Sequence, residues 1–269
     1  MNRIDSMFKE LRERNKPAFI PFITAGDPSL AVTKSLILEF DKRGSDIIEL
    51  GVPFSDPIAD GPVIQSSYHR ALSGGIKLSD IFEFIKEVRK ESGIPIVSMI
   101  SYSILYKNGC RNFIKNAVEA GFDGATIPDL PIEEAEEIIE IGKNEGFKII
   151  CFIAPTTTND RMELIVKKSQ GFLYYISVVG ITGVKCELSD DITRNIQNVK
   201  RFTNLPVALG FGISTPEQAR VAGKIADGVI VGSAIMREIA KYSFKDCNQM
   251  VDKVGRFVGE LINSAKNRS

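Results

Sequence analysis

The sequence is poor in the residues that build metal centres and nucleophilic triads. It contains a single histidine, His69, and four cysteines with no CxxC spacing. A zinc site needs at least one closely spaced pair of ligands, and most serine or cysteine nucleophiles need a histidine base. The sequence therefore predicts no metal site, and it leaves a triad only if His69 is the base. His69 lies in a helical pattern at 64–72, where we expect a solvated or capping role, and we interpret the cysteines as free thiols.

Net charge and long apolar runs are also missing. Lys plus Arg and Asp plus Glu each number 34, so the formal net charge is zero. This balance argues against a nucleic-acid partner or a polybasic membrane surface. No apolar run approaches the roughly 20 residues that a membrane-spanning helix needs. The first 16 residues are charged throughout and lack the apolar region of a signal peptide, so we expect a cytoplasmic protein.

Short apolar runs alternate with amphipathic segments along the chain. The runs expected to form strands are 18–24, 46–50, 94–100, 124–127, 147–153, 172–178, 206–209 and 228–231. Helical periodicity precedes them at 4–11 and separates or follows them at 29–43, 63–72, 78–91, 110–120, 132–144, 161–168, 190–202, 215–222, 234–239 and 245–265. Eight continuously apolar strands alternating with helices are typical of a (β/α)8 barrel. We predict one TIM barrel domain over residues 1–269, with a short leading helix and extra helices in the βα loops.

A doubly wound open sheet is the alternative fold. No GxGxxG motif follows the first strand, and no linker divides the chain. Proline and glycine recur at the βα junctions instead of concentrating at one boundary. This distribution favours the barrel, whose active site would lie in the loops at the C-terminal ends of the strands.

Two carboxylates are candidates for acid–base chemistry. The stretch from Ser45 to Pro62 (SDIIELGVPFSDPIADGP) places Glu49 at the end of an apolar strand and Asp60 in the loop after it. Carboxylates in unlike environments can divide the roles of acid and base, because the one in an apolar pocket keeps its proton. A purely structural interpretation remains open at this point: Glu49 could bond to backbone, and Asp60 could hold the turn beside Gly61.

Glycines recur after the last three strands. They stand at Gly183, at Gly210 and Gly212, and at Gly232 before Ser233. Glycine lets backbone N–H groups approach an anion closely, and barrels often hold a phosphate beside the loops after strands seven and eight. Each glycine alone is a weak signal, because glycines end strands in many proteins. Together they predict phosphate binding, and with the carboxylates they indicate a phosphate-handling lyase or isomerase.

Longer motifs make the sequence resemble one family. The matching segments are Pro21–Pro28 (PFITAGDP), Glu49–Pro62 (ELGVPFSDPIADGP), Ile127–Pro131 (IPDLP), Ala154–Thr156 (APT), Gly180–Gly183 (GITG), Gly210–Gly212 (GFG) and Val231–Ser233 (VGS). In this order the sequence resembles the tryptophan synthase α subunit family over nearly its whole length. The resemblance implies a retro-aldol cleavage of indole-3-glycerol phosphate to indole and glyceraldehyde 3-phosphate.

The resemblance also implies roles for individual residues. Glu49 would move protons at indole C3 and at the glycerol hydroxyl, and Asp60 would accept a hydrogen bond from the indole N–H. Tyr175 would hydrogen bond near Glu49, and Thr182 would lie on a loop that closes over Asp60. The apolar walls of the indole pocket would be Phe22, Ile100, Ile127 and Phe211. The phosphate would be held by Gly183, Gly212, Gly232 and Ser233.

A partner follows from the same resemblance. The family's α subunit pairs with a β subunit in an αββα heterotetramer, and the β subunit carries pyridoxal phosphate. We therefore expect no cofactor in this chain, and we expect Asp56 and Pro57 to contact the partner. The sequence departs from the family's usual Tyr-Asn-Pro at Ser103 and Ile104, on the side that faces the partner. The alternatives are a stand-alone indole-3-glycerol-phosphate lyase, a non-catalytic activator of a partner, and another barrel such as a sugar-phosphate isomerase.

Overall fold

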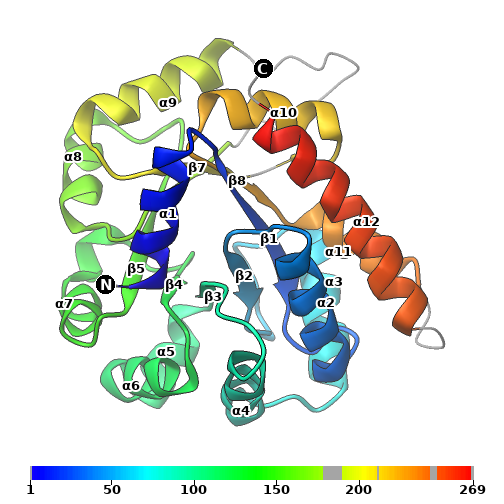
Figure 1. The fold of residues 1–269 in the computed structure, drawn as a ribbon. Helices are drawn as coiled ribbons and strands as arrows, with labels where there is room; N and C mark the ends of the chain where they lie inside the picture. The colour runs from blue at the N-terminus through cyan, green and yellow to red at the C-terminus, as the bar shows by residue number, and fades with distance from the viewer. Residues whose placement is uncertain (1, 178–189, 211, 243–246, 268–269) are drawn as a thin grey trace.

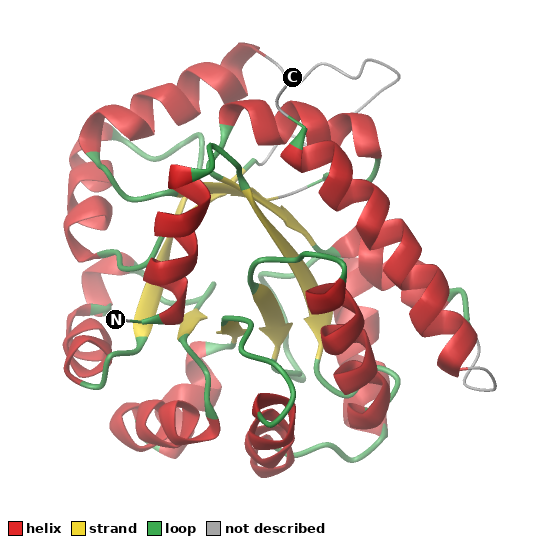
Figure 2. Cartoon of the chain, in the orientation of Figure 1, coloured by secondary structure: helices red, strands yellow, loops and turns green. Residues whose placement is uncertain are grey.

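The computed structural model describes residues 2–177, 190–210, 212–242 and 247–267. Eight parallel strands pair in chain order and close into a barrel, so the predicted (β/α)8 fold is confirmed. The strands are β1 (Ala18–Thr24), β2 (Ile48–Gly51), β3 (Ile96–Met99), β4 (Gly124–Thr126), β5 (Lys148–Ile153), β6 (Leu173–Ile176), β7 (Val207–Gly210) and β8 (Gly228–Val231). Figures 1 and 2 show these strands enclosed by a layer of helices.

The helices follow the predicted periodicity closely. They are α1 (Arg3–Glu13), α2 (Leu30–Lys42), α3 (Pro62–Ser73), α4 (Leu78–Arg89), α5 (Tyr102–Asn108), α6 (Cys110–Ala120), η1 (Ile132–Glu134), α7 (Glu136–Asn144), α8 (Asn159–Lys168), α9 (Asp190–Phe202), α10 (Pro216–Ile225), α11 (Ser233–Ala240) and α12 (Cys247–Lys266). Ser29 caps α2 through a bond from the N–H of Val32, and Thr215 caps α10. Two details differ from the prediction: α5 was not expected, and the segment 132–144 is divided into η1 and α7. Among the described residues, no helix is long and apolar enough to cross a membrane.

The leading helix closes one end of the barrel. The apolar residues of α1, Ile4, Phe8 and Leu11, are buried at helical spacing, while its other positions are mostly charged. They join a cluster with residues of the barrel interior such as Ile20 and Ile150. The helix therefore fills the N-terminal end of the barrel, and this leaves the C-terminal end for ligands.

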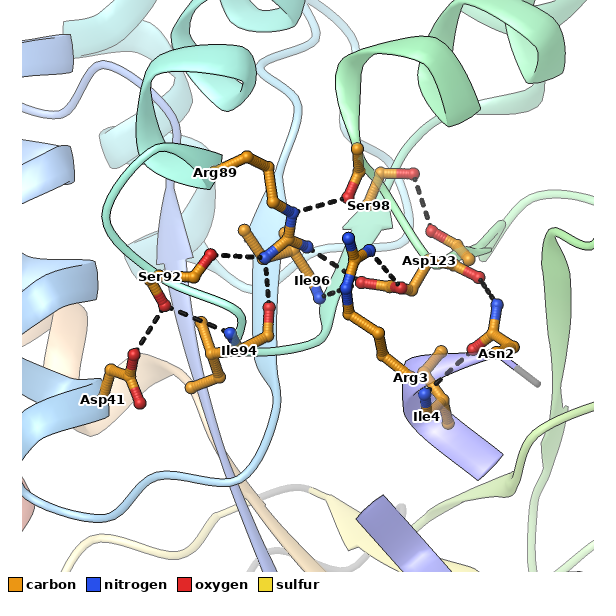
Figure 3. Close-up of polar contacts among 12 residues, drawn as sticks. Asn2, Arg3, Ile4, Asp41, Arg89, Ser92, Ile94, Ile96, Ser98 and Asp123 are labelled. Atoms are coloured by element: carbon orange, nitrogen blue, oxygen red, sulfur yellow. Dashed lines mark hydrogen bonds and ion pairs between the residues drawn. The ribbon is translucent and has the colours of Figure 1, made fainter. Parts of the chain in front are cut away.

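A buried carboxylate, Asp123, ties the N-terminal ends of β3 and β4 to α1 and α4 (Figure 3). Its two oxygens accept hydrogen bonds from Arg3 and Arg89, each at 2.9 Å. The N–H of Ile96 donates a third bond at 2.8 Å. Because these donors come from both helices and from β3, Asp123 holds three elements at the face opposite the predicted site.

The first and last strands close the ring. Ala18 of β1 pairs with Gly228 of β8, and the pairing continues to Pro21 and Val231. The C-terminal helix is tied to the start of β1, since Lys266 of α12 donates to Asp46 at 2.8 Å. Asp46 in turn accepts from the N–H of Phe19 at 2.7 Å.

Candidate active site

A cavity of about 380 Å³ opens at the C-terminal end of the barrel. Six of the residues that the sequence singled out line it together: Phe22, Glu49, Asp60, Gly212, Gly232 and Ser233. The carboxylates enter from β2 and the loop after it, and the glycines enter from the loops after β7 and β8. One hollow therefore has an acidic part and a glycine-rich part, with apolar side chains between them.

Glu49 is buried within the barrel. Its side-chain Oε1 accepts a hydrogen bond from the hydroxyl of Thr126 at 3.0 Å, and Tyr174 also lies within hydrogen-bonding reach. Burial raises the pKa of Glu49 to about 7, the negative charge of Asp60 acts in the same direction, and the two hydroxyl groups oppose this rise. Such a pKa lets one carboxyl give and take a proton near neutral pH.

Asp60 lies in a loop held by Gln65, whose amide donates to the backbone oxygen of Asp60 at 2.8 Å. Partial burial raises the pKa of Asp60 to about 6, and the charge of Asp129 adds to this rise. Asp129 is itself fixed, because it accepts from the hydroxyl of Ser101 and the N–H of Tyr102 at 2.6 and 2.7 Å. Asp60 is less buried than Glu49, so burial disfavours its ionised form less, which suits a stabiliser of positive charge beside a proton-transfer group.

The tyrosine that faces Glu49 is Tyr174, not the predicted Tyr175. Side chains alternate along a strand, so neighbouring residues of β6 point to opposite faces. Tyr174 lines the cavity, whereas Tyr175 is buried in the outer layer near Asn195 of α9. Gly210 on β7 makes room for Tyr174, because a Cβ at this position would lie 2.4 Å from the Tyr174 ring.

Two predicted pocket walls, Ile100 and Ile127, also differ by one residue from the residues that line the cavity. Ile100 lines an adjoining small hollow that shares Asp60 and Met99 with the cavity. Ile127 lines a neighbouring groove that reaches α8. Met99 and Pro128 take their places in the cavity. These two residues, like Thr126, Phe152 and Tyr174, were not predicted to belong to the site, because continuous apolar runs do not mark which residues face inwards.

The glycine-rich end of the cavity lies where α11 begins. Gly212 adopts φ +77°, which favours glycine, and Gly232 is the N-cap of α11. Ser233, the first residue of that helix, lines the cavity together with Arg237 one turn later. The N–H groups of a helix N-terminus and a guanidinium group both suit an anion. Arg237 was missed, although its spacing of four residues from Ser233 could have indicated it.

The remaining predicted residues lie elsewhere. Thr182, Gly183 and Phe211 fall outside the described residues. Asp56 is exposed on the loop between β2 and α3, and Pro57 is half-buried beside it. The same loop carries Ile58, which is 89% exposed. Within the described part of the chain, no group of three or more histidine, cysteine or carboxylate side chains could hold a metal ion.

The fold and the site together define a class, namely (β/α)8-barrel proteins with a carboxylate pair and a glycine-rich helix N-terminus at the C-terminal rim. The family model for the tryptophan synthase alpha chain matches residues 8–266. Among curated relatives, the alpha chain of Clostridium kluyveri is 46% identical over 98% of this chain and 99% of the relative. That of Thermoanaerobacter sp. (strain X514) is 44% identical over 97% of this chain and 98% of the relative. The chain belongs to the tryptophan synthase alpha chain family.

Solved structures agree with this assignment. Tryptophan synthase subunit alpha from Legionella pneumophila str. Paris matches with a TM-score of 0.92 and 35% identity, over 99% of both chains. A chain from the tryptophan synthase a2b2 complex of Pyrococcus furiosus matches with a TM-score of 0.85 and 38% identity, over 92% of this chain and 98% of that one. The chain therefore has the same barrel fold as these members of its family.

Proposed function

We propose that this chain is the α subunit of a tryptophan synthase and cleaves indole-3-glycerol phosphate to indole and glyceraldehyde 3-phosphate. The observation that carries the proposal is the placement of Glu49 and Asp60 in one cavity with a glycine-rich helix N-terminus. The reaction needs a proton donor and acceptor, a partner for a developing cation and a phosphate site. The cavity supplies a group for each of these needs.

Glu49 would carry the proton transfers. A proton delivered to indole C3 converts the ring into a leaving group, with positive charge developing at its nitrogen. Removal of the proton from the glycerol hydroxyl next to the ring then forms the aldehyde. The electrons of the broken carbon–carbon bond return to the indole. A buried carboxyl with a pKa of about 7 can serve as acid in one step and base in the other.

Asp60 would accept a hydrogen bond from the indole N–H and stabilise the developing positive charge. Its pKa of about 6 leaves it ionised at neutral pH. Phe22, Met99 and Tyr174 would flank the ring, since they line the same cavity as Asp60 and the glycine-rich end. The predicted roles of Thr182 in loop closure and of Gly183 and Phe211 in binding remain part of this proposal.

The phosphate would lie at the N-terminus of α11. Gly212, Gly232 and Ser233 would donate backbone or hydroxyl hydrogen bonds, and Arg237 would supply positive charge. Two carboxylates face the same cavity, so a cation at its other end balances the field on an anionic substrate.

A β subunit would receive the indole. The related Pyrococcus furiosus structure is described as a study of mutual activation in an a2b2 complex. We propose the same αββα assembly here, with Asp56 and Pro57 at the contact. Pyridoxal phosphate would belong to the partner, residues 1–269 would form one domain, and the protein would act in the cytoplasm.

Release of indole from indole-3-glycerol phosphate by the purified chain tests the proposal. We expect slow release that rises sharply when a β subunit is added, and little release by Glu49→Gln in either case. Fast release that ignores the β subunit would identify a stand-alone lyase. No release with or without the β subunit, while the chain still stimulates it, would identify a non-catalytic activator.

A further inference from the structure

The contact between Thr126 and Glu49 crosses the barrel interior. Glu49 of β2 is in register with Val97 of β3, and Val97 is in register with Gly124 of β4. Thr126 lies two residues after Gly124, on the same inward face. Its hydroxyl meets Oε1 of Glu49 at 3.0 Å, and Thr126 is completely buried.

A hydroxyl suits a carboxyl that must change its protonation state. An ionised carboxylate only accepts hydrogen bonds, whereas a protonated carboxyl also donates one. The Thr126 hydroxyl can donate to the first form and accept from the second, because it carries one proton and two lone pairs. A backbone N–H or a lysine could serve only the ionised form.

We propose that Thr126 is a positioning residue for Glu49: it holds Oε1 in both protonation states and leaves Oε2 to exchange the proton with the substrate. This inference rests on the proposed function, because it assigns Glu49 the proton transfers. The inference adds to the proposed function a residue on β4 that does not line the substrate cavity.

The other groups that face Glu49 are less suited to hold it in both protonation states. Asp60 faces Glu49 from the loop after β2, and as a second carboxylate it repels the ionised form. Tyr68 of α3 and Tyr174 of β6 also face it, and burial raises the pKa of each hydroxyl well above its usual value. Both tyrosines therefore stay neutral. Tyr174 lines the cavity, where the substrate would compete for its hydroxyl.

Removal of the Thr126 hydroxyl should change the pH dependence of the reaction. Thr126→Val keeps the shape of the side chain and removes the donor to the carboxylate. A hydrogen bond to a charged group corresponds to a shift of about one to two pH units. We expect the acid limb of kcat/KM for indole release to move upwards by about that amount. At neutral pH kcat should fall about tenfold, with KM nearly unchanged.

The matched control is Thr126→Ser, which keeps the hydroxyl and should restore the wild-type pH profile. If Thr126→Val does not fold, Thr126→Cys replaces it, and its weaker donor should give a smaller shift in the same direction. A Val or Cys variant that folds and keeps the wild-type profile overturns the inference. The wild-type enzyme is measured first, because absence of indole release there counts against the proposed function instead.

Discussion

Glu49 is a carboxyl held where its ionised form is disfavoured. In the unfolded chain it ionises near 4.5, whereas burial raises its pKa to about 7 in the fold. Above pH 7 the folded protein therefore carries the full cost of a buried charge. Between pH 7 and 4.5 the fold binds this proton more tightly than the unfolded chain does, so the cost falls as the pH falls.

A prediction follows for Glu49→Gln, which removes the charge and nearly keeps the volume. We expect the variant to be more stable than the wild type at pH 8, by on the order of 3 kcal/mol, with the difference shrinking towards pH 5. Urea unfolding at the two pH values measures it. Glu145→Gln, on the surface, is the control. Equal stability of wild type and Glu49→Gln at pH 8 would contradict the buried charge.

Arg237 supplies the prediction at the other end of the cavity. Arg237→Gln removes the positive charge beside Ser233 and leaves a shorter, neutral polar side chain. KM for indole-3-glycerol phosphate should rise about tenfold to hundredfold, because a charge-assisted hydrogen bond is lost. Arg220→Gln removes the same charge from an exposed position on α10 and should leave KM unchanged. Identical behaviour of the two variants would exclude Arg237 from phosphate binding.

Gly210 provides space for the Tyr174 ring, and we assign it this role instead of phosphate binding. A methyl group there would lie 2.4 Å from the Tyr174 ring and would push it away from Glu49. We expect Gly210→Ala to fold and to lose about 10- to 100-fold in indole release. Gly93→Ala is the matched control, since a Cβ at Gly93 meets nothing within 4 Å. Full activity of Gly210→Ala would show that the position of Tyr174 does not matter.

The sequence predicted which strands build the site but not always which residue of a strand faces it. Glu49 indicates which face of β2 points inwards, because burying a carboxylate in an apolar strand is costly unless it has a partner or a function. β6 is apolar or aromatic on both faces, and the small polar residues of β3 and β4, Ser98 and Thr126, are common in strands and mark no site. The expectations at Ile100, Ile127 and Tyr175 therefore each missed a residue that lines the cavity by one position, namely Met99, Pro128 and Tyr174.

At the scale of elements, the sequence predicted helix starts well where an N-cap residue lies directly before the helix. Ser29 and Thr215 were expected to open helices, and both accept the capping hydrogen bond. The short helix α5 also has a local cap, since Ser101 accepts from the N–H of Ser103, but its 7 residues carry too little helical periodicity to predict it. Part of its capping comes from a distant residue. Asp129, beyond β4, accepts from the N–H of Tyr102 at the start of α5. Only the closed barrel brings these two residues together.

Asp123 allows a test of how elements are joined at the face opposite the site. Asp123→Ala leaves the guanidinium group of Arg89 without its carboxylate in a mostly buried position. The free energy of unfolding should fall by about 3–5 kcal/mol, while the folded fraction keeps its activity. Arg3→Ala removes a half-exposed partner and should cost less than about 1 kcal/mol. Similar losses for both variants would contradict this account, and denaturant titration measures them.

At the scale of the whole molecule, two strongly exposed apolar side chains lie in the segments that follow β2 and β3, on the rim that carries the predicted partner contact. Ile58 is 89% exposed and Tyr106 of α5 is 74% exposed, both in segments at the C-terminal rim. We expect Tyr106→Ser to weaken stimulation by a β subunit about tenfold and to leave activity without the partner unchanged. Leu72→Ser, on α3, is the control and should leave stimulation intact. Indole release titrated with β subunit distinguishes the two, and full stimulation of Tyr106→Ser would exclude α5 from the contact.

The pairing of β1 with β8 also determines when the barrel can close during protein synthesis. Ala18 leaves the ribosome long before its strand partner Gly228 has been translated. At about 5–20 residues per second, β1 waits on the order of 10 to 40 seconds with one edge unpaired. During that time its apolar residues are open to chaperones and to neighbouring nascent chains. We therefore expect the yield of folded protein to depend on translation speed and chaperone supply as well as on the stability of the finished barrel.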